Sequence, residues 1–275
     1  YDKPFFFIFN VAVGGNLGGE VDTTFPKEML VDYIKVYDQD GNLDWQDDFE
    51  GEEINRDYWS FEVGNGHEQG IPGWGNNELQ YYTEAENAEL EDGNLVITAR
   101  KEERSDQHGS YDYTSTRMIT KNKINMKYGR VEIRAKLPEG QGLWPAFWML
   151  GSDIDENPWP ASGEIDIMEF IAGNTAEVHG TVHGPNHYGG GGITENFKLE
   201  KGDFTESYHT FSLEWTPDQI SWYIDDNEEA YHTVERTDDN EIIRGEKEPE
   251  YTKNKVVNGS FDSQIADDMS GAPDN

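Results

Sequence analysis

The sequence contains no cysteine, no long apolar run and few basic residues. Without cysteine no disulfide can hold the fold, and the redox compartment cannot be inferred from the chain. No apolar run approaches the roughly 18 residues of a membrane-spanning helix, so we expect no membrane partner. Only 21 basic residues stand against 56 acidic ones, giving a net charge of −35 that argues against a nucleic-acid partner.

The acidic residues are spread along the chain rather than gathered in one tail, in stretches such as WQDDFEGEE (45–53) and TDDNEIIRGEKEPE (237–250). A uniformly acidic surface resists aggregation but repels itself, an arrangement that halophilic proteins use. We therefore interpret the chain as a salt-adapted, secreted protein. An ordinary acidic enzyme is the alternative.

Helical patterns are also scarce, and the one modest candidate is FPKEML (25–30), a single turn. Alternating segments rich in β-branched and aromatic residues recur instead, for example FFFIFNVAV (5–13), GRVEIRAKL (129–137) and QISWYIDD (219–226). Turn signals such as DG, NG and GG separate them. Many short strands at regular spacing predict an all-β sandwich or barrel, and 275 residues fit one such domain.

One strand candidate, LVDYIKVY (30–37), alternates throughout. Strict alternation predicts that Leu30, Asp32, Ile34 and Val36 share one face. Between the strand candidates lie longer segments without a strand pattern, which we interpret as binding loops. They span residues 62–77, 101–112 and 184–196.

The segment GEIDIMEF (163–170) places three carboxylates, Glu164, Asp166 and Glu169, among apolar residues of strand type. Glu164 and Asp166 share a face of a strand, whereas Glu169 should point the opposite way. One β-bulge near residues 167–168 would return Glu169 to the same face, and bulges are frequent beside active sites. Two carboxyls roughly 5–5.5 Å apart serve a retaining glycosidase as nucleophile and acid/base. An exposed acidic strand is the alternative interpretation.

Just upstream, WPAFWML (144–150) places Trp144 and Trp148 four residues apart, on one face of a strand. Sugar rings have apolar faces on which indole planes stack. Two tryptophans beside three carboxylates therefore predict a groove for a polysaccharide. A pair of core aromatic residues is the alternative.

GEIDIMEF together with GLWPAFWMLG (142–151) resembles glycoside hydrolase family 16, in its laminarinase branch of endo-β-1,3-glucanases. The resemblance covers most of the chain, including WGNNELQYYT (74–83), YTSTRMITKNK (113–123) and VHGTVHGP (178–185). It implies a β-jelly roll, in which two antiparallel sheets form a sandwich with a concave substrate groove.

The resemblance implies Glu164 as nucleophile, Glu169 as acid/base and Asp166 as their helper. The expected reaction is retaining endo-hydrolysis of β-1,3-glucosidic linkages in laminarin-type β-glucan, without a cofactor for catalysis. The alternatives are a sibling acting on mixed β-1,3-1,4-glucan or a marine galactan, a transglycosylase, or a non-catalytic glucan-binding protein. Binding proteins of this type lack the catalytic glutamates, and this chain has both. We expect an extracellular monomer.

The family blocks stand in an unusual order. KPFFFIFNVAVGGN (3–16) normally closes such a domain and here opens it, whereas the N-terminal type of block, DDFEGEEINRDYW, begins at residue 47. We interpret residues 1–240 as a circularly permuted jelly-roll domain in which residues 38–46 bridge the old termini, because domain termini often lie close together. Residues 241–275 are interpreted as an acidic linker or tail, or as the start of a truncated carbohydrate-binding module.

The resemblance also implies side chains that line the sugar groove. They are Asn77, Arg117, Trp144, Trp148 and His183, with Trp74 and Asn10 as further candidates. Asparagine and arginine offer hydrogen-bond donors to ring hydroxyls, and tryptophan offers a stacking plane. Packing within the loops is the alternative for Trp74 and Asn10.

The sequence contains two candidate metal sites. His179 and His183 share a strand face, but no third ligand accompanies them, so we do not expect zinc. The resemblance implies instead a structural Ca²⁺ site on the convex side, with the Asp32 carboxylate and backbone oxygens near Glu50 and Gly93. Oxygen ligands of this kind suit a hard cation. The alternative for Asp32 is a polar, outward-facing strand residue.

Overall fold

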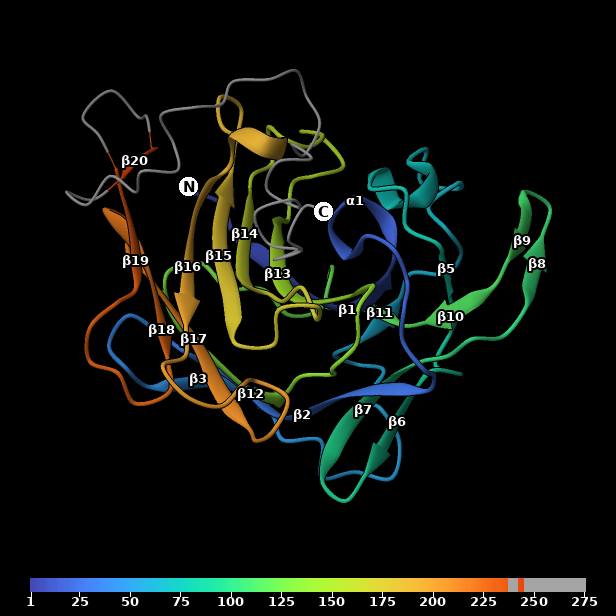
Figure 1. Ribbon diagram of the computed structural model, residues 1–275. Helices are drawn as coiled ribbons and strands as arrows, with labels where there is room; N and C mark the ends of the chain where they lie inside the picture. The colour runs from blue at the N-terminus through green and yellow to red at the C-terminus, as the bar shows by residue number, and fades with distance from the viewer. Residues whose placement is uncertain (237–241, 245–275) are drawn as a thin grey trace, which may run out of the picture.

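The computed structural model describes residues 1–236 and 242–244 of the chain. Two large, mainly antiparallel sheets lie face to face and form the body of the molecule (Figure 1). The predicted all-β sandwich is confirmed. The predicted tail, residues 241–275, lies outside the described residues except for 242–244.

The first sheet carries the candidate site and has the order β16-β15-β14-β13-β1-β11-β4. Its strands are β1 (Phe5–Val13), β4 (Ser60–Phe61), β11 (Arg117–Ile119), β13 (Leu143–Gly151), β14 (Glu164–Glu169), β15 (Glu177–His183) and β16 (Ile193–Lys198). The strand of the GEIDIMEF motif, β14, is therefore interior to the sheet, between β13 and β15.

The second sheet has the order β20-β19-β18-β17-β12-β2-β7-β6, and β3 also pairs with β2. Its strands are β2 (Lys27–Tyr37), β3 (Leu43–Asp47), β6 (Ala88–Glu91), β7 (Asn94–Ala99), β12 (Gly129–Lys136), β17 (His209–Trp215), β18 (Gln219–Ile224), β19 (His232–Arg236) and β20 (Ile242–Arg244). The predicted bridge, residues 38–46, forms the turn of the β2–β3 hairpin and most of β3.

Smaller elements decorate the sandwich. They are α1 (Gly15–Gly18), the 3-10 turns η1 (Pro72–Gly75) and η2 (Gly189–Gly191), the parallel pair β5 (Gln80–Tyr82) and β10 (Tyr113–Ser115), and the hairpin β8 (Arg104–Asp106) and β9 (Gly109–Tyr111). Figure 1 shows the β8–β9 hairpin projecting from one end of the molecule.

The apolar run FFFIFNVAV becomes β1, a central strand that is buried along its whole length. Phe7 and Phe9 enter the core between the sheets, whereas Phe6 and Ile8 pack in a separate cluster on the opposite face. Such a run is apolar at both parities because both faces of a central strand are covered.

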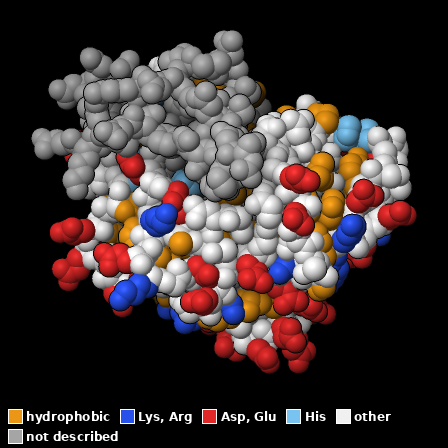
Figure 2. Space-filling view, viewed as in Figure 1, with side chains coloured by type: hydrophobic (Ala, Val, Ile, Leu, Met, Phe, Trp, Pro, Cys, Tyr) orange, Lys and Arg blue, Asp and Glu red, His pale blue; other side chains and the backbone are white. Residues whose placement is uncertain are grey.

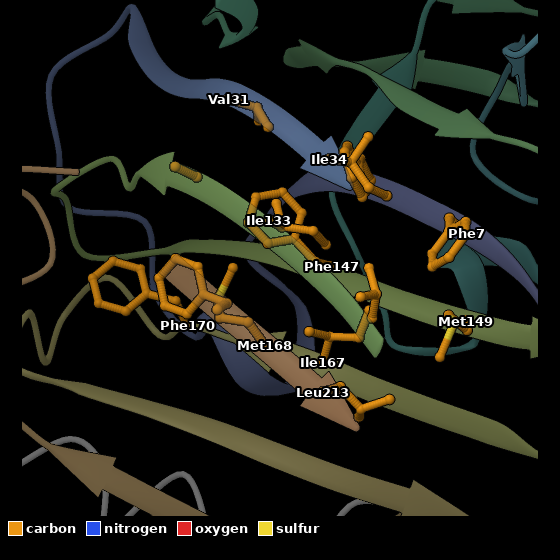
Figure 3. Close-up of a cluster of buried hydrophobic side chains, with 14 of the residues drawn as sticks. Phe7, Val31, Ile34, Ile133, Phe147, Met149, Ile167, Met168, Phe170 and Leu213 are labelled. Carbon is orange, nitrogen blue, oxygen red and sulfur yellow. The ribbon is translucent and has the colours of Figure 1, made fainter. Parts of the chain in front are cut away.

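The main core lies between the two sheets (Figure 3). Phe147 and Met149 of β13 belong to one buried cluster with Ile133 of β12 and Leu213 of β17. Burying each such side chain contributes about 1.5–3 kcal/mol. The core thus covers one face of the first sheet. The polar candidate site lies on the opposite face of the same sheet.

The predicted face of LVDYIKVY is wrong. Along β2 and β12, Tyr33 lies opposite Arg134 but Val31 lies opposite Ala135, so Asp32 is an extra residue in a β-bulge. The bulge lets both Val31 and Ile34 face the core (Figure 3). Strict alternation fails at a bulge because the bulge shifts the facing parity by one residue.

Two other local predictions also differ from the structure. FPKEML does not form a helical turn, because β2 begins at Lys27 directly after a cis Phe25–Pro26 bond. The segment 101–112, predicted as a loop, contains the β8–β9 hairpin. No helix within residues 1–236 and 242–244 is long and apolar enough to cross a membrane.

Candidate functional site

The GEIDIMEF strand contains the predicted bulge. Phe147 of β13 lies opposite Met168, but its neighbour Trp148 lies opposite Asp166, so Ile167 is the extra residue of β14. The pairing with β15 shifts at the same place. Ile167 and Met168 both point into the core (Figure 3). The bulge thereby leaves the flanking carboxylates on the opposite, groove-facing side of the sheet.

The three carboxylates interact with one another on this face. Asp166 is 3% exposed and Glu169 is 8% exposed. Burial, and then the charge of Glu169, raises the pKa of Glu164 to about 7. Burial also raises the pKa of Glu169 to about 7. Burial is thus the largest cause of the raised pKa at both glutamates.

Asp166 holds the proton of the group. Burial and the charges of Glu164 and Glu169 raise its pKa well above the ordinary value. A hydrogen bond between Asp166 and Glu164 raises the pKa of Asp166 and lowers that of Glu164. The proton in this bond therefore belongs to Asp166, and Glu164 accepts it as a carboxylate.

Side chains with hydrogen-bond donors lie beside each of the two glutamates. The Thr181 hydroxyl donates to Oε2 of Glu169 over 3.1 Å. This bond, together with the nearby Trp144 side chain, lowers the pKa of Glu169 against the effect of burial. The Trp159 side chain does the same for Glu164. Each glutamate thus has its own partner set, which separates the two in role.

Two buried histidines line the same face. Nε2 of His183 lies 3.5 Å from Oδ2 of Asp166 and 3.9 Å from Oε1 of Glu164. Burial lowers the pKa of His183 and of His179 to about 4, so both imidazoles are neutral near pH 7. Ligand atoms of Glu164, Asp166 and His183 lie within 4.8 Å of one another, where a cation could bind. His179 is not part of this group.

Asn10, Arg117 and Trp148 form one assembly beside the carboxylates. Nε1 of Trp148 donates to Oδ1 of Asn10 over 2.7 Å. The Arg117 guanidinium lies between two indoles, 4.3 Å from the ring centre of Trp74 and 4.7 Å from that of Trp148. It also pairs with Glu62 over 2.5 Å. These side chains come from β1, β11 and β13, which are neighbours in the sheet.

The remaining predicted groove residues occupy different environments. Trp144 packs beside Leu17 and Ile171 and contacts Glu169. Trp74 is buried, and its indole donates to the Gly64 carbonyl over 3.2 Å, so loop packing is its main role. Asn77 is exposed and donates to Oδ1 of Asn16 over 2.8 Å. Trp144 thus lies close to Glu169, whereas Asn77 is exposed on the surface.

Sequence reasoning missed two exposed aromatic side chains beside Glu164. Trp159 and Tyr188 are each 41% exposed, and their rings meet edge to face at 5.6 Å. The Trp159 ring also lies 6.3 Å from that of His183. Trp159 stands in WPASGEIDIMEF, five residues before Glu164, and this closeness was the available signal. Tyr188 lies in a glycine-rich loop and gave no signal.

The residues predicted for calcium are brought together only in part. The carboxylate of Glu50 lies against Gly93, where an added Cβ would be 2.8 Å from Oε1. The Asp32 carboxylate instead pairs with the Arg134 guanidinium. A cation at Asp32 would therefore have to displace that guanidinium.

Comparisons with known proteins agree with this geometry. Residues 75–272 match the family model "Glycosyl hydrolases family 16". The glucan endo-1,3-beta-glucosidase of Cryptopygus antarcticus is 43% identical over 70% of this chain and 68% of its own length. The chain spans only 43% of the glucan endo-1,3-beta-glucosidase A1 of Niallia circulans, at 35% identity over 96% of this chain.

A solved structure has the same fold. The laminarinase catalytic domain from Thermotoga maritima is 53% identical and superposes with a TM-score of 0.67. The match covers 70% of this chain and 76% of that chain. The predicted jelly-roll class is confirmed.

Proposed function

The chain belongs to glycoside hydrolase family 16, and from this premise we propose that it is an endo-β-1,3-glucanase that cleaves laminarin-type glucans with retention. The observation that carries the proposal is the triad of the half-buried Glu164 and the buried Asp166 and Glu169 on one face of β14. The glucan endo-1,3-beta-glucosidases among its relatives support the choice of linkage.

In the proposed reaction Glu169 protonates the glycosidic oxygen while the Glu164 carboxylate attacks the anomeric carbon, which forms a glycosyl-enzyme. Water then attacks this intermediate, and Glu169 accepts the proton of the water. The raised pKa of Glu169 keeps the acid protonated near pH 7. The Asp166 proton, directed at Glu164, keeps that nucleophile ionised. This chemistry needs no catalytic cofactor.

The test is a panel of laminarin, lichenan, agarose and carrageenan, with product sizes measured over time. Early release of short oligosaccharides from laminarin would support the proposal. Turnover of only lichenan or a galactan would contradict the linkage but keep the mechanism. A folded protein that binds laminarin and cleaves none of the four would contradict the enzymatic function.

We also propose an extracellular site of action, because a polymer substrate of this size is cleaved outside the cell. Immunodetection in the culture medium against the cell fraction tests this directly. Recovery of the protein only inside intact cells would contradict it.

The permuted block order remains a proposal with one structural support. Burial lowers the pKa of the Tyr1 amino group, and the nearby charge of Arg236, at the end of β19, acts in the same direction. A chain in which residues 47–236 precede residues 1–37 should therefore fold and hydrolyse the same glucan. Failure of that chain to fold would contradict the proposed permutation.

Calcium binding is also proposed, with the Asp32 carboxylate and backbone oxygens near Glu50 and Gly93 as ligands, so that the ion would take the place of the Arg134 guanidinium at Asp32. Calcium should raise the melting temperature of the chelator-treated protein, and the Asp32→Asn variant should lose this response. An unchanged melting temperature with and without calcium would contradict the site.

A further inference from the structure

Next to Arg117 lies another buried carboxylate, Glu78, that the proposed reaction does not use. Glu78 precedes β5 and is 7% exposed. Its Oε2 accepts hydrogen bonds from Nε2 of Gln80 at 2.6 Å and from the Tyr82 hydroxyl at 3.2 Å. Burial raises the pKa of Glu78 to about 7, and these bonds and the charge of Arg117 lower it. The number of its partners indicates that this buried carboxylate has a specific role in a hydrogen-bond network, which has two branches.

The first branch of the network ends at a backbone donor. The Val13 amide of β1 donates to Oε1 of Gln80 over 2.7 Å. A backbone N–H only donates, so Gln80 must present its oxygen to Val13 and its NH₂ group to Glu78. Glu78 must therefore act as an acceptor at that contact.

The second branch also ends at a group that only donates. Nε1 of Trp148 donates to Oδ1 of Asn10, whose Nδ2 donates to the Tyr82 hydroxyl over 3.1 Å. The Tyr82 hydroxyl then has its proton left for Glu78. Both branches thus converge on one acceptor atom, Oε2 of Glu78. Because the Tyr82 hydroxyl gives its proton to Glu78, it accepts from Nδ2 of Asn10, and the Asn10 oxygen is left to face Trp148.

Arg117 supplies the countercharge. Its guanidinium lowers the pKa of Glu78 and is held between the indoles of Trp74 and Trp148. Glu62 pairs with the same guanidinium from the other side. Trp148 is therefore held through its N–H by the Asn10 branch, which ends at Glu78, and through its ring face by Arg117, which pairs with Glu62 and whose charge acts on Glu78.

We propose that Glu78 is a positioning residue for glucan binding, which acts through Tyr82 and Asn10 to hold Trp148 and Arg117 against a sugar unit on the β13–β1–β11 side of the catalytic carboxylates. The inference rests on the proposed glucanase function. It assigns Glu78 no contact with the reacting atoms. Its effect should therefore appear in the binding of extended substrates and not in the bond-breaking step.

The test uses Glu78→Gln, Tyr82→Phe and the double variant, with laminari-oligosaccharides of increasing length as substrates. For the longer oligosaccharides each single variant should raise KM about tenfold, the usual effect of losing a hydrogen bond to a buried charged group, with kcat within about twofold. The double variant should be no worse than either single variant, because both changes break the same branch. The pattern of bonds cleaved should shift away from products that need the β13–β1–β11 side.

Tyr81→Phe is the matched control, because Tyr81 is the neighbouring residue on β5 and its ring contacts Tyr111 of the β8–β9 hairpin. It should leave KM and the cleavage pattern unchanged. Circular dichroism and melting curves establish whether each variant is folded. If Glu78→Gln does not fold, Tyr82→Phe alone tests the inference.

Losses in kcat that are equal for short and long substrates would overturn the inference, as would additive effects in the double variant. Lowered melting temperatures with unchanged KM would also overturn it, because the role would then be structural only. A wild-type protein that cleaves no laminari-oligosaccharide contradicts the proposed function itself, and is thereby distinguished from failure of this inference.

Discussion

At the scale of single residues, the three carboxylates of β14 differ because their surroundings differ. Glu164 accepts the Asp166 proton, whereas Glu169 accepts from the Thr181 hydroxyl. Burial raises the pKa of both glutamates to about 7, but their hydrogen-bond partners differ, and a nucleophile and an acid/base require such different surroundings. The roles proposed for Glu164 and Glu169 can therefore be tested one residue at a time.

Glu164→Gln should abolish hydrolysis and preserve binding. The amide keeps the size of the side chain but cannot attack the anomeric carbon, so kcat should fall by about 10⁴-fold or more. Initial rates on laminarin and affinity electrophoresis in laminarin gels measure the two properties. The control is Ser162→Ala, because Ser162 is buried and lies next to the motif but outside the triad. Residual turnover above about a tenth of wild type would remove Glu164 from the role of nucleophile.

The pH dependence should report Glu169. Its pKa is raised to about 7, so the acid form is present below that pH and is lost as the pH rises through it. The alkaline limb of kcat/KM should therefore fall near pH 7. Because the Thr181 hydroxyl stabilises the carboxylate form, Thr181→Val should raise this pKa and move the limb upward by about half a unit. A limb that moves downward or stays in place would contradict the assignment.

At the scale of elements, the decisive feature is the bulge in β14. Ile167 and Met168 both enter the core, which allows Asp166 and Glu169 to share the groove face although they are three residues apart. Met168 is fully buried. The same bulge thus sets both the spacing of the carboxylates and the packing of Ile167 and Met168 in the core.

Deletion of Met168 tests how the carboxylate spacing affects activity and how the core packing affects stability. The remaining sequence alternates regularly, so the strand should still form, but a buried side chain is lost and the melting temperature should drop by several degrees. Glu169 should lose its precise position, and kcat should fall by about a hundredfold. Met168→Leu, which conserves volume, should keep both properties. Full activity in the deletion variant would show that the bulge does not set the catalytic geometry.

A comparison of the bulges in β14 and β2 shows what the sequence could and could not predict. The bulge in β14 was predictable because a displaced carboxylate made regular alternation chemically unreasonable. The bulge at Asp32 in β2 was not, because LVDYIKVY alternates perfectly and only pairing with β12 reveals the shift. Glu78 was equally hidden, since its role depends on Tyr82 and Asn10, which meet it only in the folded sheet.

At the scale of the whole molecule, charge dominates. Acidic side chains are scattered over the visible face with few Lys and Arg between them (Figure 2). The chain carries 56 acidic and 21 basic residues, so most acidic groups have no cation to pair with. Self-repulsion of this kind destabilises the compact state and is weakened by salt, because the screening length falls from about 10 Å at 0.1 M to about 3 Å at 1 M.

The melting temperature should therefore rise by several degrees between 0.1 M and 1 M NaCl, most steeply at the lower concentrations, where screening changes most. A triple variant, Asp48→Asn, Glu52→Gln and Glu53→Gln, removes three exposed charges from one acidic stretch. It should melt higher than wild type at 0.1 M and gain less from added salt, since less repulsion is left to screen. Replacement of the uncharged, exposed Gln69 by Ala is the control and should leave the salt response unchanged. A melting temperature that is flat or falls with salt would contradict salt adaptation and leave an ordinary acidic enzyme, whose surface charge serves solubility alone.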